Sequence, residues 1–180
     1  MKEYSITEQQ AREMFEEHSA YVYGIALMIT KLPALADDIT QETFLRAYSK
    51  YHRYDESRPI RPWLYRITVN MTRDVLRRKS WQKLFSRVPE ADTALEQSAE
   101  SIVMHDEAKQ QLWSVVGRLS QKQREVVTLH YYAGLPLPET AAVLGIPLGT
   151  CKSRLHMALT KLRLYNEQEP ELFRVREGLK

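Results

Sequence analysis

The hydrophobic pattern along the chain is helical throughout. Apolar residues recur at steps of three and four, and no alternating stretch of useful length is present. Such spacing is typical of amphipathic helices and argues against strands. The predicted helices cover 6–31 (as one helix or two), 34–51, 60–79, 104–117 and 120–132, followed by a closing pair within 134–162. HRYDESRP, residues 52–59, is polar, ends in proline and predicts a loop.

The segment VPEADTALEQSAE, residues 88–100, breaks this pattern. It is acidic and poor in large apolar side chains, which is typical of a flexible linker. We therefore predict an all-α protein of two small helical domains joined by a flexible acidic linker, the second with a helix-turn-helix. The expected bounds are 5–85 for the first domain, 86–103 for the linker, 104–165 for the second domain and 166–180 for a polar tail.

The closing pair, GLPLPETAAVLGIPLGTCKSRLHMALTKL, has the layout of a helix-turn-helix. Gly145 stands where the first helix must end, because glycine tolerates a left-handed C-cap. Pro147 then stops continuation, whereas Pro136 lacks the side chain of a good N-cap. Two apolar stripes are expected to be buried, Leu137, Ala141 and Leu144 in the first helix and Cys151, Leu155, Leu159 and Leu162 in the second.

The second helix of this pair carries polar and basic side chains on its other faces. Residues 148–166 hold 4 basic and no acidic residues. An ordinary helical hairpin is the alternative interpretation, but a solvated helix face normally carries both signs of charge. The acid-free run therefore favours a helix that lies in the major groove of DNA, where Lys, Arg and Ser reach phosphates and base edges.

IRPWLYRITVNMTRDVLRRKSW, residues 60–81, predicts a second basic helix. Its apolar face is formed by Trp63, Leu64, Ile67, Met71, Val75 and Leu76. Its polar face, which suits a phosphate backbone, carries Arg66, Asn70, Arg73 and Arg77 at helical steps. The preceding loop holds Tyr51, His52, Arg53 and Tyr54, and such rings and cations together suit unstacked bases. Arginines that merely cover the helix's own apolar surface explain this segment equally well.

Composition changes this picture through the distribution of charge. The 180 residues carry a net charge of only +3. Residues 46–87 nevertheless hold 12 basic and 3 acidic residues, while 1–45 hold 3 basic and 8 acidic ones. Residues 88–107 hold 6 acidic and no basic residues. Two basic blocks on helices, separated by an acidic segment, indicate a polyanion as partner.

Other classes of protein are not indicated. A single cysteine, Cys151, excludes an internal disulfide and a multi-cysteine metal site. The five histidines show no metal-ligand spacing, and the 6 glycines form no phosphate loop. The longest apolar run, 21–29, is far shorter than the roughly 20 residues of a membrane-spanning helix, and residues 1–10 lack a signal-peptide core. We expect a cytoplasmic, soluble protein without membrane insertion, which is not an enzyme and needs no metal or cofactor.

Three stretches of the chain carry a family resemblance. ADDITQETFLRAY (36–48) is similar to a segment that binds core RNA polymerase. RPWLYRITVNMTRDVLRRK (61–79) is similar to a helix that melts and reads the −10 promoter element. LSQKQREVVTLHYYAGL, followed by AAVLGIPLGTCKSRLHMAL, is similar to a domain that reads the −35 element. In this order, over about 10–85 and 105–163, they resemble a bacterial sigma factor of the extracytoplasmic-function (ECF) type.

The resemblance implies an alternative sigma factor that binds core RNA polymerase and directs promoter-specific initiation. The positions that match the contact with the clamp of the largest polymerase subunit are Asp38, Gln41, Glu42 and Leu45. The positions that match the −10 contact are His52, Arg53, Tyr54, Arg66, Asn70, Arg73 and Arg77. The positions that match the −35 contact in the helix-turn-helix are Thr150, Lys152, Ser153, Arg154, His156, Met157 and Thr160.

The implied partners are core RNA polymerase, promoter DNA and an anti-sigma factor, which in this family is often membrane-anchored. The chain also departs from the family pattern. Met157 replaces a common arginine, which removes a hydrogen-bond donor from the groove face, and Pro136 replaces the usual serine cap. Thr140 and Cys151 stand where isoleucine and valine are usual.

A stand-alone DNA-binding regulator, such as a dimeric repressor or activator, is the alternative function. It accounts for the helix-turn-helix but gives no role to the basic helix of the first domain or to the acidic segment around Asp38. Half-site footprints obtained without polymerase would favour it.

Overall fold

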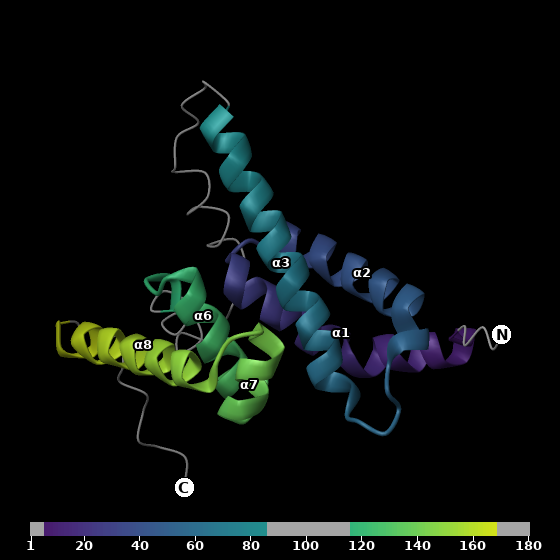
Figure 1. Cartoon of the computed structure of the whole chain (residues 1–180). Coiled ribbons are helices and arrows are strands. Elements are labelled where there is room, and N and C mark those ends of the chain that lie inside the picture. Colours follow the sequence, from purple (N-terminus) through teal and green to yellow (C-terminus); the bar gives the residue numbers. More distant parts are fainter. Residues whose placement is uncertain (1–5, 86–115, 169–180) are drawn as a thin grey trace, which may run out of the picture.

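The computed structural model describes residues 6–85 and 116–168, and every regular element in these two ranges is a helix. This confirms the predicted all-α class. The elements are α1 (Glu8–Thr30), α2 (Pro33–Lys50), the 3₁₀ turn η1 (Tyr51–Arg53), α3 (Ile60–Phe85), α6 (Gln121–Val127), the π-helical turn η2 (Thr128–Tyr132), α7 (Leu137–Leu144) and α8 (Leu148–Gln168). Helices α1–α3 gather into a first domain and α6–α8 into a second (Figure 1).

The first domain is a bundle in which each of α1, α2 and α3 packs against the other two. The start of α1 is fixed by Thr7 and Gln10, whose side chains cap each other's backbone N–H groups. Its end is marked by Lys31, which adopts the left-handed conformation at φ 62°. Proline is tolerated in the first turn of a helix, and α2 begins at Pro33. The three helices bury Ile25, Phe44 and Leu64 between them.

The helix predicted over 120–132 is only partly α-helical. It starts as expected, because Ser120 and Gln123 form a capping box. After Val127 the chain widens into the π-helical turn η2, in which the Ala133 N–H donates to the Thr128 carbonyl. Periodicity could not distinguish the two forms, since α- and π-helical turns bury apolar residues at similar steps.

The helix-turn-helix forms as the sequence predicts. Gly145 ends α7 in the left-handed conformation, at φ 64°, and its N–H contacts the carbonyls of Ala141 and Ala142. Pro136 precedes α7 and provides no side-chain cap, again as expected. In α8 the predicted stripe faces inwards, with Cys151 and Leu155 buried and Leu159 and Leu162 half-buried. The helix continues to Gln168, a few residues beyond the expected end of the domain at 165.

The two domains contact each other directly. Helix α3 packs against α7, and α1 packs against α6 and η2. One cluster of buried apolar residues runs through both domains and includes Ile25 and Val69 of the first and Val126 of the second. Gly24 of α1 lies so close to the Tyr132 ring that a Cβ atom there would overlap it. The predicted linker 86–103 and most of the predicted helix 104–117 lie outside the described residues, although 116 and 117 are helical.

Candidate nucleic-acid interface

Helix α8 presents a continuous exposed face opposite its buried stripe. Its side chains at Lys152, Ser153, His156, Met157 and Thr160 are exposed, as is Thr150 in the first turn. The Ser153 hydroxyl donates to the Gly149 carbonyl at 3.0 Å, which leaves its oxygen free to accept from a ligand. Met157 is 51% exposed, so an apolar side chain lies among polar ones. The structure therefore brings six of the seven predicted −35 residues to the surface on one helix.

The seventh residue, Arg154, is turned elsewhere. It is half-buried and lines a cleft between the domains together with Arg73, Lys122 and Glu125. The cleft has a volume of about 610 Å³. Arg154 stays a prediction as a DNA contact, but it does not share the exposed face of Lys152 and His156.

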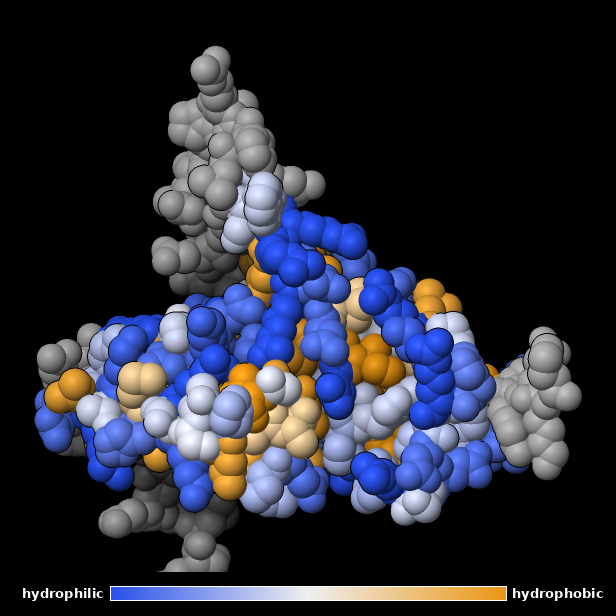
Figure 2. Space-filling model, viewed as in Figure 1, coloured by the Kyte–Doolittle hydropathy of each residue, from blue (hydrophilic) through white to orange (hydrophobic). Residues whose placement is uncertain are grey.

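The polar face of α3 is exposed at three of its four predicted positions. Arg66, Asn70 and Arg77 are exposed, and Arg77 forms an ion pair of 3.0 Å with Asp74 on its own helix. An ion pair this exposed, within one helix, contributes little stability and leaves the guanidinium accessible. Figure 2 shows hydrophilic side chains along the visible side of α3 and apolar ones around α7.

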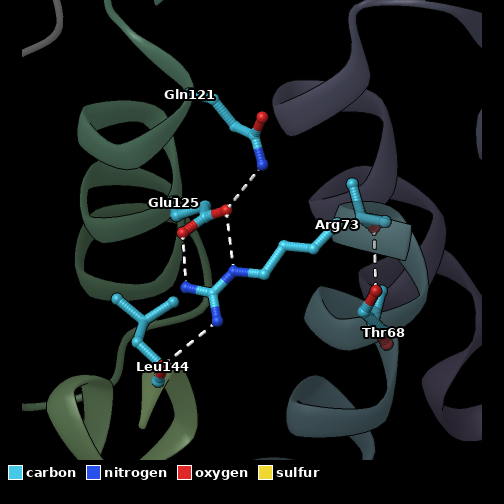
Figure 3. A network of polar contacts seen from close by, with 6 residues as sticks. Thr68, Arg73, Gln121, Glu125 and Leu144 are labelled. Atoms are coloured by element: carbon cyan, nitrogen blue, oxygen red, sulfur yellow. Dashed lines mark hydrogen bonds and ion pairs between the residues drawn. The ribbon is translucent and has the colours of Figure 1, made fainter. Parts of the chain in front are cut away.

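The fourth position, Arg73, is bound by the second domain. Its Nε and Nη2 atoms donate to the two carboxylate oxygens of Glu125 at 3.0 and 2.6 Å. Its Nη1 atom donates to the Leu144 carbonyl at 3.1 Å (Figure 3). The hydrogen bonds to Glu125 raise the pKa of Arg73 above its usual value, against the opposing effect of burial. Arg73 therefore differs from its three neighbours on the predicted polar face.

The loop before α3 is folded by its own side chains. Asp55 accepts hydrogen bonds from the Ser57 N–H and hydroxyl at 3.1 and 2.6 Å, and these lower the pKa of Asp55. The Tyr54 ring packs against Trp63, with ring centres 5.1 Å apart, so it is half-buried. His52 and Arg53 are exposed and adjacent, and the Arg53 Nε atom donates to His52 at 3.3 Å. The two exposed residues are thus the accessible part of the predicted loop contact.

The predicted polymerase-binding residues lie together on α2. Asp38 and Gln41 are exposed, and Leu45 is 61% exposed although it is a large apolar side chain. Glu42 is half-buried and forms an ion pair of 3.0 Å with Arg46. An exposed leucine among acidic and amide side chains is consistent with a protein-binding surface.

Glu125 is the residue that sequence reasoning missed. It is 1% exposed, and Gln121 on the preceding turn also donates to it, at 3.0 Å. A fully buried carboxylate requires a partner. The position of Glu125 beside Val126 and Val127 on a predicted helix could therefore have indicated that it is buried and paired. The pattern contained nothing that identified Arg73 as that partner.

The chain matches two sequence families. Sigma-70 region 2 matches residues 14–82, and Sigma-70, region 4 matches residues 109–162. The ECF RNA polymerase sigma factor SigL of Mycobacterium tuberculosis is 34% identical over 154 residues, which cover 85% of this chain and 86% of that protein. SigM of Bacillus subtilis, also an ECF sigma factor, is 33% identical over 156 residues, covering 86% and 94%.

Two solved structures are similar to the fold. The structure of CnrH in complex with the cytosolic domain of CnrY has a TM-score of 0.65 at 27% identity and covers 91% of each chain. The sigma factor RpoE of Bartonella quintana was solved in complex with the anti-sigma factor NepR and has a TM-score of 0.69 at 21% identity. The match covers 92% of this chain and 98% of the RpoE chain, and it supports the fold alone. The chain belongs to the ECF sigma factors of bacterial RNA polymerase, which direct transcription initiation.

Two further observations apply to the described ranges only. No helix in them is long and apolar enough to cross a membrane. No group of three or more His, Cys, Asp or Glu side chains within them is arranged to hold a metal ion.

Proposed function

We propose that this sigma factor binds core RNA polymerase in the cytoplasm, reads the −35 element with α8, and melts and reads the −10 element with α3 and the loop before it. It performs no catalysis of its own. The observation that carries the proposal is the exposed face of α8, where residues 149–163 include no acidic side chain. A face of this kind is suited to polyanionic DNA.

At the −35 element, α8 enters the major groove with its exposed face towards the bases. Lys152 supplies charge for phosphates or for guanine, while Ser153 and His156 offer hydrogen-bonding groups to base edges. Met157 offers an apolar contact, which in the major groove suits the methyl group of thymine. Arg154 lies on the cleft side of α8, from which its cation is suited to the adjacent phosphate backbone.

At the −10 element, the first domain captures bases as they leave the stack. Asn70 can form two hydrogen bonds to one base edge, and Arg66 and Arg77 on either side suit the phosphates. Aromatic and cationic side chains can hold an unpaired base, and stacking is worth about 1–3 kcal/mol per base. The ring of His52 is exposed for this purpose, whereas the ring of Tyr54 supports the loop from below.

The proposed protein partner of α2 is the clamp of the largest polymerase subunit, which would contact Asp38, Gln41 and Leu45. We also propose a regulatory polypeptide as partner. This proposal rests on CnrH of Cupriavidus metallidurans, which is 33% identical over 143 residues and whose structure was solved with the cytosolic domain of CnrY. Such an anti-sigma factor would cover the exposed faces of α2 and α8.

Reconstitution with core polymerase tests the proposal. The purified chain, mixed with core enzyme and a library of promoter fragments, is expected to yield transcripts from a defined subset. Leu45→Asp should abolish association with core, whereas Leu164→Asp, which places the same change on an exposed leucine of α8, should not. If the wild-type chain fails to associate with core polymerase, the proposal is wrong. Binding to paired DNA half-sites without polymerase would instead support a stand-alone regulator.

A further inference from the structure

Arg73 belongs to two surfaces that cannot be used together. Arg73 lies three residues after Asn70 on α3, which places it on the helix face proposed to contact the −10 element. In the structure its side chain reaches out of the first domain to the second, where it contacts α6 and the end of α7 (Figure 3). Only 30% of its side chain is exposed.

The contact with the second domain occupies all three guanidinium nitrogens. Nε and Nη2 form a bidentate pair with Glu125, and Nη1 donates to the Leu144 carbonyl. This fork geometry is also the one by which an arginine binds a phosphate. Three of the five N–H groups of Arg73 are used, and Glu125 and the Leu144 carbonyl each occupy one of the two edges that can bind a bidentate ligand. A phosphate therefore competes with these acceptors for Arg73.

Glu125 is arranged to receive this cation. Its carboxylate is buried and is held by Gln121 as well as by Arg73. Leu144, the second acceptor, directly precedes the turn residue Gly145. In the closed arrangement of the domains, Arg73 therefore connects α3 to the turn between α7 and α8.

We propose that Arg73 is a switch residue that alternates between Glu125 and promoter DNA, so that the closed arrangement of the two domains competes with engagement of the −10 element. The proposal rests on the proposed role of α3 at the promoter. Other contacts between the described parts of the two domains also align the closed form. Among them, Arg124 donates to the Ile29 carbonyl at 3.1 Å, and Tyr132 packs against Gly24 and Tyr21.

The position of the ion pair makes it suited to opening. Arg73 and Glu125 border the cleft of about 610 Å³ between the domains, so water and competing anions reach one side of the pair. Arg73 is 30% exposed while Glu125 is 1% exposed. Displacement of the arginine must therefore be accompanied by separation of the domains, which returns the Glu125 carboxylate to water. DNA, which offers a row of phosphates, would be such a competing anion.

Energy transfer between two dyes tests the closed form in the isolated full chain. Cysteines replace the exposed residues Glu16 on α1 and Arg163 on α8, with Cys151→Ala to remove the buried thiol. Glu125→Gln is expected to lower the ratio of closed to open molecules about tenfold, as expected for loss of a charged hydrogen-bonded pair. Glu139→Gln, which removes an exposed carboxylate from α7, should leave the ratio unchanged.

Two further variants keep this result interpretable. Exchange of the charges in Arg73→Glu with Glu125→Arg should restore energy transfer that either single change lowers. Arg73→Lys, which keeps the charge but loses the fork, should give an intermediate value. Circular dichroism melts verify that each variant folds. Unchanged energy transfer in folded Glu125→Gln would overturn the role of the pair.

Promoter opening by the reconstituted holoenzyme tests the competition. Glu125→Gln should increase opening at limiting sigma factor several-fold, whereas Glu139→Gln should not. If the dyes separate in Glu125→Gln but opening is unchanged, Arg73 is not shared between two partners and the proposal is wrong. A wild-type chain that gives no transcripts at all refutes the proposed function instead, and the dye measurement still decides whether the ion pair holds the domains together.

Discussion

Helices α3 and α8 have the same pattern in the sequence, but their basic faces are exposed to different extents in the structure. Each has a buried apolar stripe and a polar, basic face. On the polar face of α8, Lys152, Ser153, His156, Met157 and Thr160 are all exposed. The face of α3 is divided, because Arg73 is bound to Glu125 while Asn70 beside it is free to meet a ligand. The face proposed to bind duplex DNA is therefore exposed on α8, whereas the proposed −10 face of α3 is exposed only in part.

The difference follows from where each helix lies. Helix α3 packs against α1, α2 and α7, so it stands between the two domains (Figure 1). Within the described residues, helix α8 packs against α6 and α7, and it extends away from the first domain. Basic side chains on a helix at the rim of a fold stay exposed to solvent. Basic side chains on a helix at a domain boundary can instead pair with acidic groups of the other domain. Charge pattern alone therefore indicates an affinity for anions but does not identify the anion.

The exposed face of α8 gives the largest expected effect. Lys152→Glu should lower affinity for duplex −35 DNA by roughly 10- to 100-fold, because a carboxylate would face phosphates and base edges. Lys161→Glu is the matched control, since Lys161 is also exposed but lies nine residues, or about 2.5 turns, further along the helix and is not a predicted contact. Fluorescence anisotropy with the holoenzyme measures both variants. Equal losses in the two would show that α8 contributes only general charge.

A substitution in the exposed part of the α3 face is expected to have the next largest effect, on promoter opening. Asn70→Ala should reduce promoter opening roughly tenfold, because one or two hydrogen bonds to an extruded base are lost. Association with core polymerase should stay close to the wild-type value, since the residues proposed to contact core lie on α2. Permanganate reactivity of thymines reports opening, and co-purification reports association. A parallel loss of opening and association would rule out the assigned role of Asn70.

The contrast between the two helices also shows what could be predicted from the sequence. The positions of α3 and α8, the left-handed Gly145 and the buried Cys151 all followed from periodicity and turn chemistry. These features depend on residues within a few positions of one another. The pairing of Arg73 with Glu125 joins residues 52 positions apart, each of which fits an ordinary helix. Contacts of that kind depend on how the domains dock, which local patterns do not encode.

Met157 gives a smaller effect that sharpens the role of α8. Its exposed thioether is suited to the methyl group of thymine, and one methyl group in apolar contact is worth about 0.8 kcal/mol, or roughly fourfold in affinity. After a −35 site has been selected from random duplexes, each thymine is replaced by deoxyuridine, which lacks the methyl group. One replacement should weaken binding by the wild type and have no effect on Met157→Ala. If no thymine shows this dependence, Met157 does not read that group.

The smallest expected effect comes from comparing a buried histidine of the first domain with an exposed histidine of the second. His18 in the first domain is 3% exposed, and its Nδ1 atom has no hydrogen-bond partner among the described residues. Burial lowers the pKa of His18, Glu17 opposes this shift and Arg61 adds to it. The native state therefore prefers neutral His18, whereas the unfolded chain takes up a proton near the ordinary value of 6.5.

The direction of the pH effect follows from this difference. Stability from neutral His18 is fully present above about pH 6.5 and decreases as the pH falls towards the lowered native pKa, by at most about 1.4 kcal/mol per pH unit. Thermal melts at pH 7.5 and 5.5 should show a smaller acid-induced loss for His18→Leu than for the wild type. The same substitution at the exposed His156 of α8 should leave the loss unchanged. If both substitutions behave alike, the acid sensitivity has another source than the buried ring of the first domain.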